Sequence, residues 1–363
     1  MKGNKTASWQ LLKRLLKNRG ALFGLIVIVC SVLIAIFAYS LAPDGSPNAN
    51  RMIPEIANKK PGFSMKFLKI KTDKAAVVTG FWATLTGGRE DPFQYLPIIE
   101  GRIQADTYQV QKYVDEDVSV PLTIPVKMTA SPGIVTLKFY LGTDKFGRDI
   151  LSRLILGTRI SLAVGLIAVF LSLTVGMFLG AVAGYFGGRT DNFVMWLINV
   201  VWSIPTLLLV FALTLALGKG FWQVFVAVGL SLWVSVARLV RGQIMAMKSL
   251  EYVEAAKVLG YSSTRIIMRH LLPNIIGPVM VIAASNFASA IVIEAGLSFL
   301  GLGVQPPQAS WGLMIKENYN FIITSNPALA LIPGLAIMLL VLAFNLLGNG
   351  LRDATDTTAI ASV

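Results

Sequence analysis

The sequence predicts an all-α polytopic membrane protein with six transmembrane helices, into which a β-rich extracytoplasmic domain is inserted. Two observations carry this prediction. The chain of 363 residues is 55% hydrophobic and only 14% charged, a balance that soluble domains with a charged surface rarely show. It also contains six apolar runs of the length that crosses a bilayer, roughly 20 residues. These runs lie at residues 21–42, 160–184, 192–217, 221–240, 275–297 and 328–348.

The first run is predicted to be a retained membrane anchor. Basic residues precede it and small residues lie near its end, as in a secretory signal peptide. The run is too long for a signal peptide, whose apolar region has about 7–15 residues. Cys30 lies in this run and is the only cysteine, which excludes an internal disulfide and a cysteine-based metal cluster. We interpret Cys30 as a small buried hydrophobic residue.

The positions of Lys and Arg predict that both termini are cytoplasmic. The N-terminal tail carries six basic residues and the loop 238–274 carries another six, whereas the loop 298–327 carries only Lys316. Short basic loops stay on the cytoplasmic side of a membrane. The same rule explains the net charge of +13. We therefore expect a lipid bilayer, and no nucleic acid, as a partner.

The segment 43–140, between the first two runs, is predicted to form the ordered domain outside the cytoplasm. Its stretches at 117–130 and 134–141 alternate or are rich in β-branched and aromatic residues, as strands are. The stretch KAAVVTGFW at 74–82 has a similar composition and is also predicted to be extended.

The second long outer loop, 298–327, mixes apolar residues and glycines with a Pro-Pro pair and Trp311. This mixture is typical of an interfacial or re-entrant segment packed on protein. A surface loop in which Trp311 serves as a membrane anchor fits equally well. Both interpretations remain open.

Glycines and prolines within the runs predict local packing. Gly176, Gly180 and Gly184 recur every four residues, so they share one helix face and allow another helix to approach closely. Pro205 and Pro333 lie inside the third and sixth runs, where a missing backbone donor permits a kink.

The polar stretch EYVEAAKVLGYSSTRIIMRHLLPN, residues 251–274, predicts two short cytoplasmic helices. Ser249 is expected to cap the first helix, and Gly260 to end it in the left-handed conformation. The second helix is expected to begin at Ser262 or Ser263 and to stop at Pro273.

Leu250, Val253 and Ala256 lie on one stripe of the first short helix and predict an apolar edge exposed to the cytoplasm. Such an edge needs cover. A groove in a partner protein and the headgroups of the inner membrane surface are both consistent with it.

The same stretch resembles the EAA loop of permease subunits in binding-protein-dependent ABC importers. The matching residues are Glu254, Ala255, Ala256, Gly260, Leu272 and Pro273. The family favours Ile two places before Leu-Pro, and His270 at that place is similar to the peptide and nickel branch. Four further stretches resemble the second permease of that branch: GTDKFGRDILSRLILGTRISL (142–162), WSIPTLLL (202–209), EAGLSFLGLGVQPPQASWGLMI (294–315) and NLLGNGLRDATD (345–356).

The resemblance implies the type I ABC importer permease fold over residues 141–356, with a cytoplasmic coupling loop at 248–274. Before this core lie the cytoplasmic tail with the first helix, 1–42, and the inserted domain, 43–140, which is far longer than the connection usual in the family. The C-terminal tail is 357–363.

The resemblance also implies a function and a location, the bacterial inner membrane. With a homologous second permease, the chain would form the path for peptides or a related small solute. An extracytoplasmic substrate-binding protein would deliver the solute, and two cytoplasmic ATPase subunits would use ATP. In such an importer the residues of the EAA pattern make the contact with the ATPase.

We expect no catalytic site, metal or cofactor in this chain itself. In a phosphate-binding Walker A loop, a glycine precedes the Lys that is followed by Ser or Thr. None of the Lys-Ser or Lys-Thr pairs in this chain has that glycine, and His270 is the only histidine.

Two sets of charged residues are further candidates. Glu294 is a carboxylate within a predicted span, which favours a role in a gate or pathway, although a structural network fits equally. Asp144, Arg148 and Asp149 precede the second span, and the spacing by four places Asp144 and Arg148 on one helical face. We interpret this set as an outer scaffold that touches a substrate-binding protein; a helix cap with a surface ion pair is the alternative.

Two rival classes of function remain. A self-sufficient secondary transporter would show inverted halves and more intramembrane ionisable residues, and would leave the cytoplasmic helix pair without a purpose. A membrane-anchored receptor would account for residues 43–140 but not for six spans.

Overall fold

A computed structural model describes residues 13–72, 80–116, 118–218, 220–322 and 326–355 of the chain. The C-terminal tail predicted at 357–363 and most of the N-terminal tail lie outside the described residues. The chain forms two compact units. The first comprises Met1–Ser31, Ser161–Val304 and Ile337–Val363, and the second comprises Val32–Ile160 and Gln305–Ala336.

Long apolar helices dominate the described chain and match the predicted runs. Five are long and apolar enough to cross a membrane: α2 (Arg19–Ile36), α5 (Ile150–Phe186), α8 (Phe221–Met247), the continuous segment Ser263–Leu300 that ends in α11 (Ile276–Leu300), and α13 (Ala328–Thr355). A bent pair, α6 (Gly188–Trp202) and α7 (Thr206–Leu217), makes a sixth if it is counted as one span. The prediction of six apolar spans is confirmed in this sense.

Shorter helices and turns connect the long ones. They are α3 (Ala38–Leu41), η1 (Pro47–Ala49), η2 (Pro54–Ile56), α4 (Phe81–Gly87), η3 (Val126–Met128), α9 (Glu251–Val258), α10 (Ser263–Ile266), η4 (Ile267–Leu271), η5 (Leu272–Ile275), α12 (Trp311–Asn318) and η6 (Tyr319–Ile322).

The two prolines predicted to permit kinks behave differently. The run 192–217 is broken at Pro205, and α6 and α7 meet there at 93°. Pro205 cannot donate a backbone hydrogen bond and disfavours a helical conformation in the residue before it, so a helix readily ends at this point. Pro333, in contrast, lies inside α13, which continues through it.

The predicted glycine face packs α5 closely on α8. A Cβ atom on Gly176, Gly180 or Gly184 would lie 2.5–2.8 Å from Val236, the Ala237 carbonyl oxygen or the Arg241 carbonyl oxygen, respectively. Val236 and Ala237 are adjacent in α8, and Arg241 lies about one turn further along it. The three glycines therefore remove the side chains that would otherwise separate the two helices.

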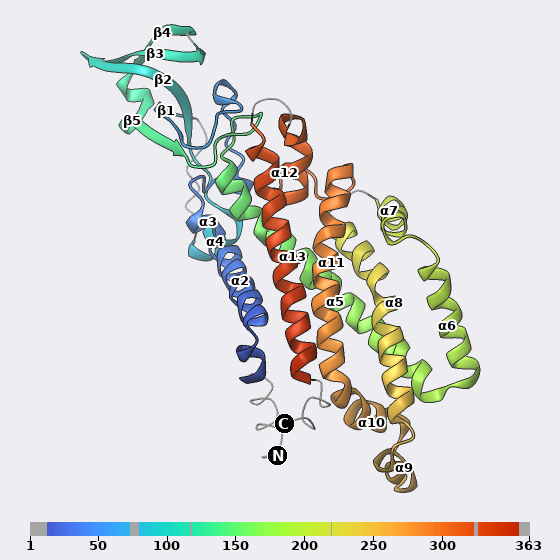
Figure 1. Ribbon diagram of the computed structural model, residues 1–363. Helices are drawn as coiled ribbons and strands as arrows, with labels where there is room; N and C mark the ends of the chain where they lie inside the picture. The colour runs from blue at the N-terminus through green and yellow to red at the C-terminus, as the bar shows by residue number, and fades with distance from the viewer. Residues whose placement is uncertain (1–12, 73–79, 117, 219, 323–325, 356–363) are drawn as a thin grey trace. The chain divides into compact units, whose positions relative to one another are not determined.

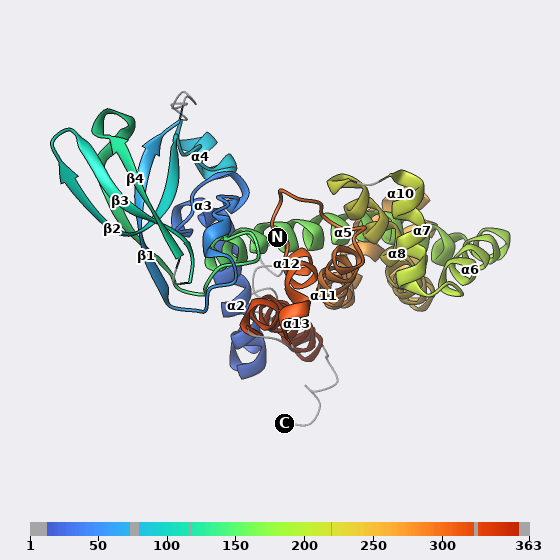
Figure 2. The ribbon, with the colours of Figure 1, turned by 90° about the horizontal axis from the view of Figure 1, so that it is seen from above.

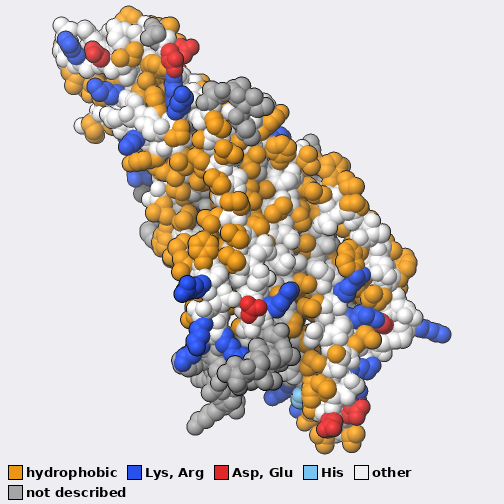
Figure 3. All heavy atoms as spheres, in the orientation of Figure 1, with side chains coloured by type: hydrophobic (Ala, Val, Ile, Leu, Met, Phe, Trp, Pro, Cys, Tyr) orange, Lys and Arg blue, Asp and Glu red, His pale blue; other side chains and the backbone are white. Residues whose placement is uncertain are grey.

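The start of α2, the start of α11 and the end of α13 lie at the same end of the first unit (Figure 1). The Asn18 amide donates to Asp353 at 3.1 Å, and Gly277 lies against Thr355. The linker to α9 and α10 lies at this same end, where Figure 3 shows Lys and Arg side chains gathered. Apolar side chains cover the lengths of α11 and α13 in the same view.

Cys30 is exposed on α2, so its predicted burial is wrong: the outer face of a membrane helix needs no protein cover.

A five-stranded antiparallel sheet lies in the second unit, with its strands side by side in Figure 2. The order is β4-β3-β2-β1-β5. The strands are β1 (Phe63–Lys71), β2 (Phe93–Gln104), β3 (Thr107–Asp115), β4 (Val118–Pro125) and β5 (Thr129–Phe139). The strands predicted at 117–130 and 134–141 are therefore present.

The extended stretch predicted at 74–82 is wrong where the structure describes it. Residues 74–79 lie outside the described residues, and Phe81 begins α4. Gly80 is the helix cap, and the Thr84 hydroxyl donates to the Gly80 carbonyl at 3.2 Å, so local backbone capping outweighs β propensity here.

The connection that precedes the sheet covers one of its faces. Ile53 and Ile56, from the region of η1 and η2, pack with Phe67, Tyr113 and Phe139, and all five side chains are buried. Thr143 ties the far end of β5 to this connection, since its hydroxyl donates to the Ile56 carbonyl and accepts from the Lys59 N–H. The sheet and the residues just before α5 therefore form one packed body.

The contact of α5 with α8 predicts a selective effect of one added methyl group. Gly180→Ala places a Cβ 2.5 Å from the Ala237 carbonyl oxygen. We expect a loss of about 1–3 kcal/mol in the free energy of unfolding because the helices must separate. Gly242→Ala on α8, where nothing lies within 4 Å, is the matched control and should not destabilise. Equal unfolding curves for the two purified variants in detergent would contradict the packing argument.

Candidate functional site

The loop 248–274 folds as two short helices joined by a sharp corner, as predicted, but its first cap differs. Leu250 occupies the N-cap position of α9 without a side-chain cap. The Ser249 hydroxyl instead donates back to the Ala246 carbonyl at 3.4 Å. Ser249 therefore belongs to the end of α8, and its predicted role as the cap of α9 is wrong because the chain is still turning out of α8 at that point.

The inner side of α9 is anchored in a large apolar core. Val253 and Ala256 are buried against Val240 and Ile244 of α8, together with Ile266 of α10. The apolar edge predicted to face the cytoplasm through these residues therefore faces inward. The end of α8 and the second short helix supply its cover.

The outer side of α9 presents Glu251, Glu254 and Ala255 together with two strongly exposed apolar residues, Val258 and Leu259. Val258 is 88% exposed and Leu259 is 71% exposed. Among the large hydrophobic side chains of the described residues, Val258 is the most exposed. These two adjacent exposed apolar side chains make the outer side of α9 a candidate contact surface.

Gly260 has the predicted left-handed conformation, with a φ of +75°. The Gly260 N–H donates to the Lys257 carbonyl at 2.9 Å, and the Tyr261 N–H donates to the Ala256 carbonyl at 3.1 Å. This arrangement satisfies the carbonyls at the end of α9. Ser262 then caps α10 by accepting from the Arg265 N–H, as expected. His270 stacks on Tyr261, with ring centroids 6.0 Å apart.

The second short helix does not stop at Pro273. It passes through the wider π-turn η4 and the tighter η5 into α11, so Ser263–Leu300 is one continuous apolar segment. The Leu272 N–H donates to the Ile267 carbonyl, five residues back. The wider turn makes room for the ring of Pro273, which would otherwise clash with a carbonyl of the preceding turn. Pro273 is exposed, and Leu272 is half-buried.

Glu294 is fully buried in α11 and belongs to a hydrogen-bonded group. Its Oε1 accepts from the Ser298 hydroxyl at 2.7 Å, and that hydroxyl accepts from the Val304 N–H at 3.1 Å. Gly303 lies directly against Ser298. The carboxylate is thereby linked to the turn that follows α11.

Asp144, Arg148 and Asp149 are brought together by a turn rather than by a helix, because α5 begins only at Ile150. The Arg148 Nε donates to Asp144 Oδ2 at 2.6 Å, while Asp144 Oδ1 accepts from the Arg148 and Phe146 N–H groups. The shared helical face predicted for Asp144 and Arg148 is therefore wrong, although their ion pair is present.

All three side chains are buried, at 5% exposure or less, so the ion pair is not a surface pair. Asp149 is the cap of α5: its Oδ2 accepts from the Ser152 N–H at 2.8 Å and from the Ser152 hydroxyl. Burial raises the pKa of the Asp149 carboxyl, and the nearby Asp44 carboxylate adds to the rise.

Two members of this buried cluster could not be found from the sequence. Glu317 of α12 lies 2.6 Å from Arg148 and 3.5 Å from Arg153, and Arg153 lies 3.9 Å from Asp144. Glu317 comes from 169 residues further along the chain than Arg148. The sequence signal is weak: α5 carries two charged residues, Arg153 and Arg159, and α12 carries two, Lys316 and Glu317.

The cluster attaches α12 to the start of α5, and a second contact strengthens the attachment. Trp311 is 4% exposed, and its indole N–H donates to the Leu154 carbonyl at 3.0 Å. Gly157 provides the space that the indole occupies. Trp311 thus packs on protein, and the alternative of a membrane anchor is wrong.

Two family models match parts of the chain. Residues 176–358 match the family of the binding-protein-dependent transport system inner membrane component, and residues 8–61 match the N-terminal transmembrane domain of oligopeptide transport permease C. A glutathione transport system permease of Pectobacterium atrosepticum is 43% identical over 60% of this chain and 72% of the relative. A dipeptide transport system permease of Bacillus subtilis is 42% identical over 60% of this chain and 68% of the relative.

Among solved structures, the chain is similar to an inward-facing methionine ABC transporter, with a TM-score of 0.48 and 18% identity over 57% of this chain and 98% of the other.

The apolar helices that are long enough to cross a membrane, together with the two family matches, identify the chain as a membrane permease. The chain belongs to the family of binding-protein-dependent transport system inner membrane components. It is a multi-pass permease subunit of an ABC importer, and ATP hydrolysis in such importers takes place in separate subunits.

The buried cluster predicts a large effect of removing one carboxylate. Glu317→Ala leaves Arg148 and Arg153 buried with fewer negative partners, so we expect a loss of about 3–5 kcal/mol in the free energy of unfolding. Glu116→Ala is the control: its side chain is 82% exposed beside Lys59, and exposed pairs contribute about 0–1 kcal/mol. Equal losses in thermal or denaturant unfolding would refute the role of the cluster.

Proposed function

We propose that the chain is the second-type permease of a peptide importer, and that it forms the solute path with a homologous permease. Two ATPase subunits on the cytoplasmic side and a substrate-binding protein on the outer side complete the importer. Relatives named as oligopeptide, dipeptide and glutathione permeases support a peptide or peptide-like cargo. The family match supports the set of partners and the type I permease fold.

Both termini and the loop 248–274 are cytoplasmic in this proposal. The basic residues of the N-terminal tail and of the loop support this orientation. The packing of Asn18 against Asp353, and of Gly277 against Thr355, also supports it, because these contacts bring the start of α2, the end of α13 and the start of α11 to one side.

The contact with the ATPase is made by the outer side of α9. Glu254 and Ala255 line it, Val258 and Leu259 extend it, and the Gly260 corner fixes its end. Ala256 acts from the inner side by seating α9 on the core. Leu272 and Pro273 hold the turn that joins the second short helix to α11. The exposure of Val258 is the observation that carries this proposal, because an uncovered apolar side chain favours a protein groove.

The outer residues form a scaffold in the same proposal. The cluster of Asp144, Arg148 and Glu317 keeps α12 fixed to the start of α5, and Asp149 caps that helix. Glu294 holds the turn after α11 through Ser298, which supports a positioning role rather than direct contact with the solute.

The sheet β1–β5 is an inserted extracytoplasmic domain. It lies between the two family matches, which end at residue 61 and begin again at residue 176. The sheet lies between the first and the second span. Because the N-terminal tail is cytoplasmic in this proposal, the connection after the first span is on the outer side of the membrane.

Val258→Asp tests the contact. We expect the variant to insert into the membrane normally but to retain much less ATPase when the tagged permease is purified, because a charge cannot enter an apolar groove. Lys257→Gln, a conservative change at an exposed neighbour, is the control. An unchanged yield of ATPase with Val258→Asp, or consistent purification of the wild type without any ATPase, would count against the proposal.

The Gly260 corner makes a separate prediction. Gly260→Val should lose ATP-driven transport without losing membrane insertion, since nothing lies within 4 Å of the added Cβ and the strain comes from the φ of +75° alone. Gly260→Asn should keep most transport, because asparagine tolerates the left-handed conformation. Transport assays in which the two variants behave alike would overturn the hinge assignment.

A further inference from the structure

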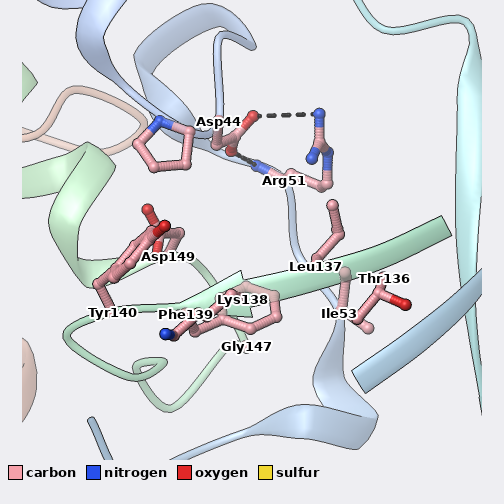
Figure 4. Close-up of a pocket in the computed structure, with 11 residues that line it drawn as sticks. Asp44, Arg51, Ile53, Thr136, Leu137, Lys138, Phe139, Tyr140, Gly147 and Asp149 are labelled. Carbon is pink, nitrogen blue, oxygen red and sulfur yellow. Dashed lines mark hydrogen bonds and ion pairs between the residues drawn. The ribbon is translucent and has the colours of Figure 1, made fainter. Parts of the chain in front are cut away.

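A pocket of about 260 Å³ lies in the second unit, and Asp149 of the turn before α5 is one of the residues that line it. Three segments build it, as Figure 4 shows: the connection containing Asp44, Arg51 and Ile53, the end of β5 from Thr136 to Tyr140, and the turn with Gly147 and Asp149 before α5. Since one water molecule occupies about 30 Å³ in the liquid, the pocket has room for a small organic molecule.

Asp149 supplies the pocket with a buried oxygen that the fold leaves unused. The residue is 5% exposed, and its Oδ2 caps α5 through Ser152. Its Oδ1 is buried and accepts no hydrogen bond from any residue that the structure describes. Helix capping therefore accounts for the burial of Oδ2 but not for that of Oδ1. A buried oxygen that receives no hydrogen bond costs free energy.

The Arg51 guanidinium, which lines the pocket, is held by other acidic residues. Arg51 lies 2.7 Å from Asp91 and 3.4 Å from Asp44, and its guanidinium stacks over Tyr95 at 4.2 Å. The Asp44 oxygens accept from the Ser46 and Arg51 N–H groups. Within the described residues, no ion pair of Asp149 is found.

Lys138 lines the exposed part of the pocket, with its Nζ 5.1 Å from the Tyr140 ring centroid. The pocket thus has a buried carboxylate in its wall, an exposed ammonium group in its lining, and apolar surface from Pro43, Ile53 and Leu137 between polar residues. Burial raises the pKa of the Asp149 carboxyl and the neighbouring Asp44 carboxylate adds to the rise, because both disfavour the charged form.

We propose that this pocket binds a small zwitterion, an amino acid or a very short peptide, by its protonated amino group. The ammonium donates to Asp149 Oδ1, and the carboxylate of the same molecule pairs with Lys138. The apolar wall covers the carbon atoms between the two charges. This site stands on the geometry of the second unit alone, so it holds whether or not the chain transports peptides.

Binding of defined probes to the purified full chain in detergent tests the proposal, with isothermal titration calorimetry as the readout. L-alanyl-L-alanine carries both charges, alaninamide carries only the ammonium, and N-acetyl-L-alanyl-L-alanine carries only the carboxylate. We expect the first to bind most tightly, the second to bind more weakly, and the third to bind at least tenfold more weakly than the first. Equal binding of the acetylated probe, or binding of none of the probes, overturns the proposal.

Two variants separate binding from folding. Asp149→Asn should weaken L-alanyl-L-alanine at least tenfold while α5 keeps its cap, because asparagine caps helices as well as aspartate does. Thr136→Trp should block the pocket from the exposed side of β5 without touching the cap. Glu116→Gln, an exposed carboxylate outside the pocket, is the matched control.

Lys138→Gln should weaken the binding of L-alanyl-L-alanine but leave the binding of alaninamide unchanged. This result would show that Lys138 pairs with the carboxylate of the dipeptide. Unchanged dipeptide binding in both Asp149→Asn and Thr136→Trp refutes the site. A lysine side chain of a docked protein would offer the same ammonium group; if only a protein bearing such a lysine binds and the free probes do not, the proposal of a small-molecule site fails.

Discussion

Polar groups that are removed from water need partners within the protein, and this requirement shapes most of the chain. Long helices satisfy their own backbone groups across the apolar runs. At two prolines that remove a donor the backbone changes its geometry: the chain bends by 93° at Pro205 and passes through a π-turn before Pro273. The buried charges of Asp144, Arg148 and Glu317 are held against one another for the same reason. Asp149 Oδ1 is one of the buried side-chain atoms to which the described chain offers no hydrogen-bond partner.

Features that depend on local chemistry could be predicted from the sequence. The apolar runs, the face formed by Gly176 and its repeats, the left-handed Gly260 and the cap at Ser262 each follow from composition or from spacing within one turn of helix. Strands in the region 117–141 follow from β-branched alternation. These features need no knowledge of what the segment packs against.

Features that depend on distant partners could not be predicted. The inward direction of Val253 and Ala256 is set by α8 and α10, which offer an apolar surface that a single helix does not reveal. Glu317 joins Arg148 across 169 residues, and no spacing rule relates them. The size of the bend at Pro205 is likewise a matter of tertiary packing, since Pro333 leaves α13 continuous. The hydrogen-bond partner of Ser249 cannot be predicted from its position, because a serine between two helices can bond to the end of the first or cap the start of the second.

The way α9 is seated has a mechanical consequence. Its inner residues share one core with Ala181 and Tyr185 of α5 and with Val240 and Ile244 of α8. The glycines of α5 let these two long helices pack in direct contact. A displacement of α9 by a partner would therefore move α5 and α8 together, because their close packing leaves no space in which side chains could rearrange.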